Sequence, residues 1–87
     1  MIRVLIVDDE PLIAEAHKTY VERTPGFEVA GVAHSGAAAM RFASTEAVDL
    51  VLLDIGLPDA SGIDVAAALG GLRPSPDVIA VSYTHLR

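Results

Sequence analysis

The chain has 87 residues, a net charge of −6 at pH 7, a hydrophobic fraction of 52% and no cysteine. This length allows one small domain, the acidic balance argues against direct nucleic-acid binding, and the lack of cysteine excludes disulfide frameworks and thiolate metal sites. No apolar run approaches the ~20 residues that cross a bilayer, so we expect a soluble cytoplasmic protein without membrane contact.

Strand and helix patterns alternate along the chain. Residues 2–7 form a β-branched run that predicts a buried strand, and Pro11, with Asp9 or Glu10 as the cap, begins a helix that ends before Thr24. The further elements expected are a strand over 27–32, a helix from Ser35 to about Ser44, a strand over 48–53, a helix from Ser61 to about Leu69, and a strand over 77–81. This order is typical of an α/β fold with a parallel sheet and helices on both faces.

Acidic residues follow two of the expected strands. Asp8 and Asp9 end the first strand, and Asp54 ends the third. If these strands are neighbours, the three carboxylates converge at one edge of the sheet, where open α/β sheets bind ligands. Their repulsion favours a divalent cation such as Mg²⁺, and a carboxylate there could attack phosphorus.

Other interpretations of polar residues remain open at this point. Acids after a strand often only cap the next helix, which is the favoured interpretation for Glu10. His17 and His34 are interpreted as solvent-facing side chains rather than metal ligands, and residues 54–64 lack the pattern of a calcium loop.

Three segments carry a resemblance to a known family. Residues 4–11, residues 49–59 and the pair Ser61–Gly62 together resemble the receiver domain of bacterial two-component response regulators. The resemblance implies a flavodoxin-like sheet with strand order 2-1-3-4, in which the fifth strand and the last helices are missing. Residues 17–27 are similar to the subfamily that answers citrate and dicarboxylate sensor kinases.

The resemblance also implies roles for individual residues. Asp54 matches the phosphoacceptor, which takes a phosphoryl group from a sensor histidine kinase. Asp8, Asp9, Asp54 and the backbone carbonyl of Gly56 would bind Mg²⁺, and the Ser82 hydroxyl would sense the phosphoryl group. Pro58 would shape the loop after the phosphoacceptor. The implied output is a DNA-binding transcriptional regulator domain, which is absent from this chain.

The sequence departs from the family pattern near its C-terminus. Lys18 is the only lysine and lies in the first helix, so it cannot replace the phosphate-contacting lysine of the family's fifth strand. We expect the fourth strand to be an open edge through which the chain could form a dimer. Residues 82–87 match the translation of a sequencing adapter, so we expect a truncated receiver domain over 1–81 and a non-native tail over 82–87.

These observations leave three functional hypotheses. The first is a phosphorylation switch rather than an enzyme acting on an outside substrate. The second is a small Mg²⁺-dependent phosphotransferase or phosphatase with an aspartate nucleophile, although Gly56 stands where such enzymes carry a second aspartate. The third is a degenerate receiver that acts as a protein-interaction module.

Overall fold

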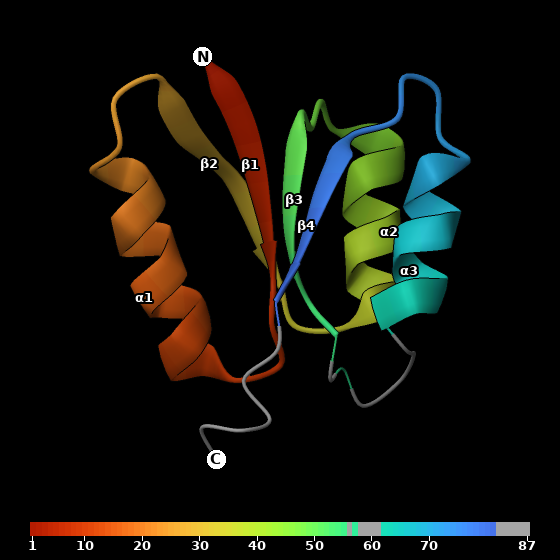
Figure 1. The fold of residues 1–87 in the computed structure, drawn as a ribbon, viewed down its shortest axis with the longest axis horizontal. Helices are drawn as coiled ribbons and strands as arrows, with labels where there is room; N and C mark the ends of the chain where they lie inside the picture. The colour runs from red at the N-terminus through yellow and green to blue at the C-terminus, as the bar shows by residue number, and fades with distance from the viewer. Residues whose placement is uncertain (56, 58–61, 82–87) are drawn as a thin grey trace.

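A computed structural model describes residues 1–55, 57 and 62–81 (Figure 1). Four strands alternate with three helices in the order β1 (Ile2–Val7), α1 (Pro11–Glu22), β2 (Phe27–Ala33), α2 (Gly36–Thr45), β3 (Leu50–Asp54), α3 (Gly62–Gly70) and β4 (Asp77–Val81). The strands form one parallel sheet in the order β2-β1-β3-β4. The expected α/β class and the expected strand order are confirmed.

Most element boundaries agree with the sequence to within one or two residues. The largest difference is at β3, which begins at Leu50 rather than at residue 48 and includes Asp54. The N-cap of α2 is Ser35, whose Oγ accepts a hydrogen bond from the Ala38 N–H at 3.1 Å.

The expected acidic cap of α1 is confirmed in its position but not in its side-chain hydrogen bond. Glu10 occupies the N-cap position but makes no capping hydrogen bond with its side chain. Its backbone N–H instead donates to Asp8 Oδ1 at 2.9 Å. Pro11 has no N–H to satisfy, which lowers the need for a cap at this terminus.

The helices lie on both faces of the sheet (Figure 1). Helix α1 packs on β1 and β2 from one side, and α2 and α3 cover the other side. Strand β1 is central, so Val4, Leu5, Ile6 and Val7 are almost fully buried. Val4 and Ile6 pack toward Ala14 and Val21 of α1, whereas Leu5 and Val7 belong to the core beneath α2 and α3, which includes Val51, Leu53, Val65 and Leu69.

One half of the α1 face is less covered than the rest of the sheet. Leu50 and Leu52 of β3 are half-buried, and Ile79, which pairs with Leu52 in the β4 register, is 50% exposed. Within the described residues, β4 pairs only with β3. Among all residues that the structure describes, no helix is long and apolar enough to span a membrane.

Arg3 of β1 forms contacts with β2 and with the segment just before β3, at the N-terminal end of the sheet. Its Nη1 donates to Glu28 Oε2 of β2 at 2.9 Å, and its Nε donates to the Ala47 carbonyl, just before β3, at 2.9 Å. Its backbone N–H donates to Asp49 Oδ2 at 2.8 Å. These contacts span 25 to 46 residues of sequence, so they stabilise the tertiary arrangement rather than local structure.

Replacing Arg3 with Ala should lower the free energy of unfolding by about 1 kcal/mol, because the Glu28 pair is partly screened by solvent while the hydrogen bond to Ala47 is lost outright. Urea denaturation measures the difference. Arg41→Ala, at an exposed arginine of α2, is the matched control and should change stability by less than ~0.5 kcal/mol. Equal losses in the two variants would show that the Arg3 contacts contribute nothing specific.

Candidate functional site

The carboxyl ends of β1 and β3 bring three acidic residues together. Val7 lies opposite Leu53 in the parallel β1–β3 register, so the next residues, Asp8 and Asp54, emerge side by side at the same edge of the sheet. One carboxylate oxygen from each of Asp8, Asp9 and Asp54 lies within 4.8 Å of the others. The cluster is therefore a product of strand order, because the two segments are more than 40 residues apart in the sequence.

The cluster is withdrawn from solvent. Asp8 is 1% exposed, Asp54 is 2% exposed and Asp9 is half-buried. Asp8 Oδ1 accepts the Glu10 N–H, but the buried Asp8 Oδ2 and Asp9 Oδ1 have no hydrogen-bond partner among the described residues. A buried carboxylate oxygen without a hydrogen-bond donor lowers the stability of the fold. A positively charged ligand bound to these two atoms would therefore be favourable.

Electrostatics around Asp8 point in the same direction. Burial is the largest cause that raises the pKa of the Asp8 carboxyl above its usual 3.8, and the charges of Asp54 and Asp9 raise it further. The Glu10 N–H and His17 lower this pKa, but they only partly offset the increase. The folded chain thus holds Asp8 in an environment that disfavours its own negative charge.

The donor set fits a hard divalent cation. Carboxylate oxygens are the ligands that Mg²⁺ prefers, and Mg²⁺ is commonly held by one or two carboxylates with water completing its shell. Two buried oxygens without donors, beside a third acid, match this requirement. Among the described residues, the candidate metal ligands include neither His17 nor His34.

His34 is a neighbour of the cluster that the sequence did not indicate. It directly follows β2, and its Nδ1 lies 3.0 Å from the Asp8 carbonyl oxygen. Because a carbonyl only accepts, this bond requires the hydrogen on Nδ1. The ring is exposed, as expected, but it also helps to fix the Asp8 backbone. The sequence signal that could have indicated His34 is its position directly after β2, because parallel strands end at the same edge of the sheet as the acidic cluster.

Several predicted site residues lie outside the described residues. These are Gly56, Pro58 and Ser82, together with the capping residue Ser61. The roles assigned to Asp8, Asp9 and Asp54 stay predictions, although the structure places these three side chains in one cluster.

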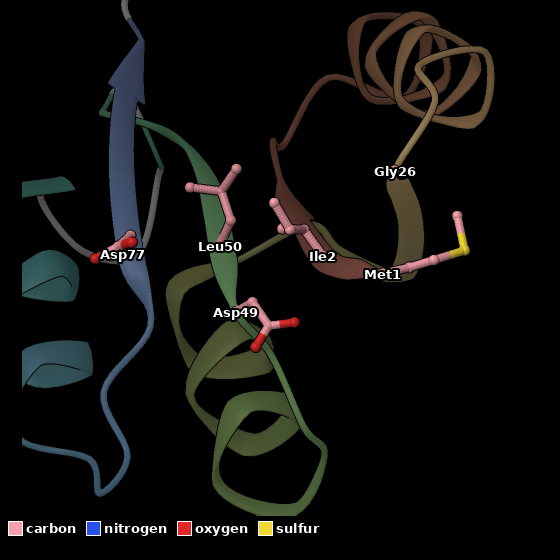
Figure 2. Close-up of a pocket in the computed structure, with 6 residues that line it drawn as sticks. All are labelled: Met1, Ile2, Gly26, Asp49, Leu50 and Asp77. Carbon is pink, nitrogen blue, oxygen red and sulfur yellow. The ribbon is translucent and has the colours of Figure 1, made fainter.

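A surface hollow at the opposite end of the sheet is not a comparable site. Figure 2 shows the residues that line it: Met1, Ile2, Gly26, Asp49, Leu50 and Asp77. Its two carboxylates belong to exposed residues, and Asp49 Oδ2 already accepts the Arg3 N–H. The hollow is wide and open, so it lacks the buried oxygens that distinguish the acidic cluster.

Comparisons with known sequences agree on one protein family. The family model described as "Response regulator receiver domain" matches residues 4–86. The transcriptional regulatory protein MalR of Bacillus subtilis is 37% identical over 82 residues, and DcuR of Escherichia coli K12 is 39% identical over 84 residues. Each match covers 94% of this chain, and the chain spans only about a third (35%) of each relative.

Solved structures show the same fold. The MaeR response regulator bound to beryllium trifluoride has a TM-score of 0.85 and 33% identity, covering 94% of this chain and 67% of that one. TrrA of Thermotoga maritima, in complex with Mg²⁺ and beryllofluoride, has a TM-score of 0.86 and 34% identity, covering 100% of this chain and 75% of that one.

Proposed function

Because the chain belongs to the response regulator receiver domain family, we propose that it is a phosphorylation switch in which Asp54 accepts a phosphoryl group from a sensor histidine kinase. The observation that carries this proposal is the buried acidic cluster around Asp54, with oxygens of Asp8 and Asp9 that lack hydrogen-bond donors. Family membership explains why such an unfavourable cluster is retained.

Asp54 supplies the nucleophile. One carboxylate oxygen attacks the phosphorus of a phosphohistidine, a new O–P bond forms, and the P–N bond to the imidazole breaks. The imidazole nitrogen keeps the electron pair and takes up a proton. A carboxylate oxygen carries the lone pair that forms the new O–P bond, so this step needs no general base. Burial of Leu53 and Val51 in the core holds the end of β3 in place for this attack.

Asp8, Asp9, Asp54 and the Gly56 carbonyl would hold Mg²⁺. When bound, this ion supplies positive charge that offsets the negative charge of the transferring phosphoryl oxygens. Asp8 and Asp9 would contribute the oxygens that have no hydrogen-bond donor, and a cation there would offset both their desolvation and their mutual repulsion. The Mg²⁺ in the related TrrA structure supports this assignment.

The signal would pass to a DNA-binding output domain. The curated relatives are transcriptional regulatory proteins rather than classical enzymes, which disfavours the phosphatase hypothesis. We also propose that the Ser82 hydroxyl senses the phosphoryl group. The protein would act in the cytoplasm, and its kinase would belong to the citrate and dicarboxylate class.

The division into a receiver over 1–81 and a non-native tail over 82–87 stays a prediction. Sequencing of the source DNA beyond codon 81 would test it.

Binding of a phosphoryl mimic tests the switch directly. With Mg²⁺ and beryllofluoride added together, we expect the backbone amide NMR signals of Asp8, Asp9, Asp54 and Ile55 to shift, and those of Asp49 and Asp77, at the far end of the sheet, to remain in place. Beryllofluoride without Mg²⁺ is the control and should have little effect. Shifts spread evenly over the chain, or none at all, would contradict the proposal and favour the interaction module.

Within the described residues the outer edge of β4 has no partner strand, and we propose that two chains pair there. The Asp77 N–H and the Val81 carbonyl bond toward β3, so strand alternation directs the backbone groups of Val78 and Ala80 outward. Antiparallel pairing of two copies about Ile79 would place Val78 opposite Ala80 with no like charges opposed. In sedimentation experiments, Ala80→Pro should weaken the dimer about tenfold because it removes an outward N–H. Ala80→Val retains that N–H and should dimerise like the original chain; equal behaviour of both variants would exclude this edge.

A further inference from the structure

Gly62 makes an unusually close contact with the residue after Asp54. Gly62 is the buried first residue of α3, and its N–H donates to the Ile55 carbonyl at 3.3 Å. A Cβ built on Gly62 would overlap the Ile55 Cα and would lie 2.7 Å from both Ile55 Cβ and Cγ2. Any side chain at position 62 would therefore collide with backbone, which cannot rotate away.

Both sides of this contact are held firmly. The Ile55 N–H donates to the Val81 carbonyl of β4 at 3.1 Å, so hydrogen bonds fix the Ile55 peptide groups on both sides. Helix α3 is anchored through Val65 (4% exposed) and Leu69 (0% exposed) in the core that contains Leu53. Because Ile55 directly follows Asp54, a displacement of Ile55 by such a collision would also displace the Asp54 end of β3.

We propose that Gly62 is a positioning residue for Asp54: its missing side chain lets α3 lie against Ile55 and so keeps the Asp54 carboxylate in the acidic cluster. The functional part of this inference rests on the proposed function, whereas its structural part does not. Helix propensity alone predicts that Gly62→Ala stabilises the chain, since Ala is the better helix former, whereas the collision with Ile55 predicts a loss. The two explanations are therefore separable.

Two other glycines provide matched controls. A Cβ on Gly31 would also collide, at 2.6 Å, but with the ring of Phe42, a half-buried side chain of α2, rather than with backbone. A Cβ on Gly70, at the other end of α3, would meet nothing within 4 Å. Gly31→Ala therefore reproduces a steric collision away from Asp54, and Gly70→Ala reproduces the added methyl group without a collision.

The experiment compares the three Gly→Ala variants in the full chain by amide hydrogen exchange and by affinity for Mg²⁺ with beryllofluoride. In Gly62→Ala we expect the Ile55 amide to exchange about tenfold faster relative to the β1 amides, and the affinity to fall on the order of 10- to 100-fold, as small displacements of reacting groups do. Gly31→Ala should speed exchange of all core amides together, and Gly70→Ala should change neither quantity by more than about twofold.

The outcomes are distinguishable. If the original chain does not bind Mg²⁺ with beryllofluoride, the proposed function fails, and the exchange of Ile55 still decides the role of Gly62. If Gly62→Ala retains both the affinity and the Ile55 protection, or if it unfolds as judged by circular dichroism, the local positioning role is overturned.

Discussion

Replacing Asp54 with Asn should reduce phosphorylation of the chain by an acyl phosphate and Mg²⁺ by roughly 10³-fold, the size of effect that loss of a nucleophile produces. The amide matches the carboxylate in shape but lacks the charge and the lone-pair reactivity that attack on phosphorus needs. Intact-mass spectrometry measures the gain of a phosphoryl group, and peptide mapping places it. Asp77→Asn makes the same charge change at the far end of the sheet and should leave the reaction intact.

Stability distinguishes a lost nucleophile from a lost fold. Asp54 is buried beside Asp8 and Asp9, so its neutralisation removes repulsion between like charges that is worth about 1–4 kcal/mol at such separations. Without metal, Asp54→Asn should therefore be more stable to urea than the original chain while remaining inactive. An inactive variant that is also less stable would undermine the nucleophile assignment, and a phosphorylated Asp54→Asn chain would refute it.

Mg²⁺ should stabilise the chain, and Asp8→Asn should lose most of that effect. A ligand that binds only the folded state adds about 2.7 kcal/mol at 100 times its Kd. Asp8 has a buried oxygen without a donor, so its replacement by a neutral amide should remove one of the ligands that we propose for Mg²⁺. Thermal unfolding across a Mg²⁺ titration measures the shift, with Asp77→Asn as the control. A Mg²⁺ response that persists unchanged in Asp8→Asn would exclude Asp8 as a ligand.

The same variant has a defined pH dependence in the absence of metal. The pKa of Asp8 is raised in the folded state, chiefly by burial, so the folded chain binds this proton more tightly than the unfolded chain does. The contribution of Asp8 to stability therefore improves as the pH falls from neutral through the raised pKa, and it levels off below the unfolded value near 3.8. Asp8→Asn should remove this component and should be the more stable chain at pH 7. If the stability advantage of Asp8→Asn over the original chain grew as the pH fell, the burial argument would be contradicted.

The element order and the positions of the acids were predictable from the sequence because both depend on local patterns. Apolar runs such as residues 2–7 end abruptly in charged residues, and breakers such as Pro25 and Gly26 separate them. The alternation of strands and helices restricts the topology to a parallel sheet, and the resemblance in residues 4–11 and 49–59 implied its strand order. The proximity of Asp8 to Asp54 follows from that order.

The tertiary structure alone decided which groups lack partners and which contacts are close. Glu10 was a reasonable cap by sequence, yet its N–H bonds to Asp8 because of how the chain turns out of β1. Nothing in the local sequence indicates that Arg3 reaches Glu28 and Ala47, or that Gly62 lies against Ile55. These features depend on distances between segments far apart in the chain, and such distances are set by the packing of helices on the sheet rather than by the propensity of any one segment.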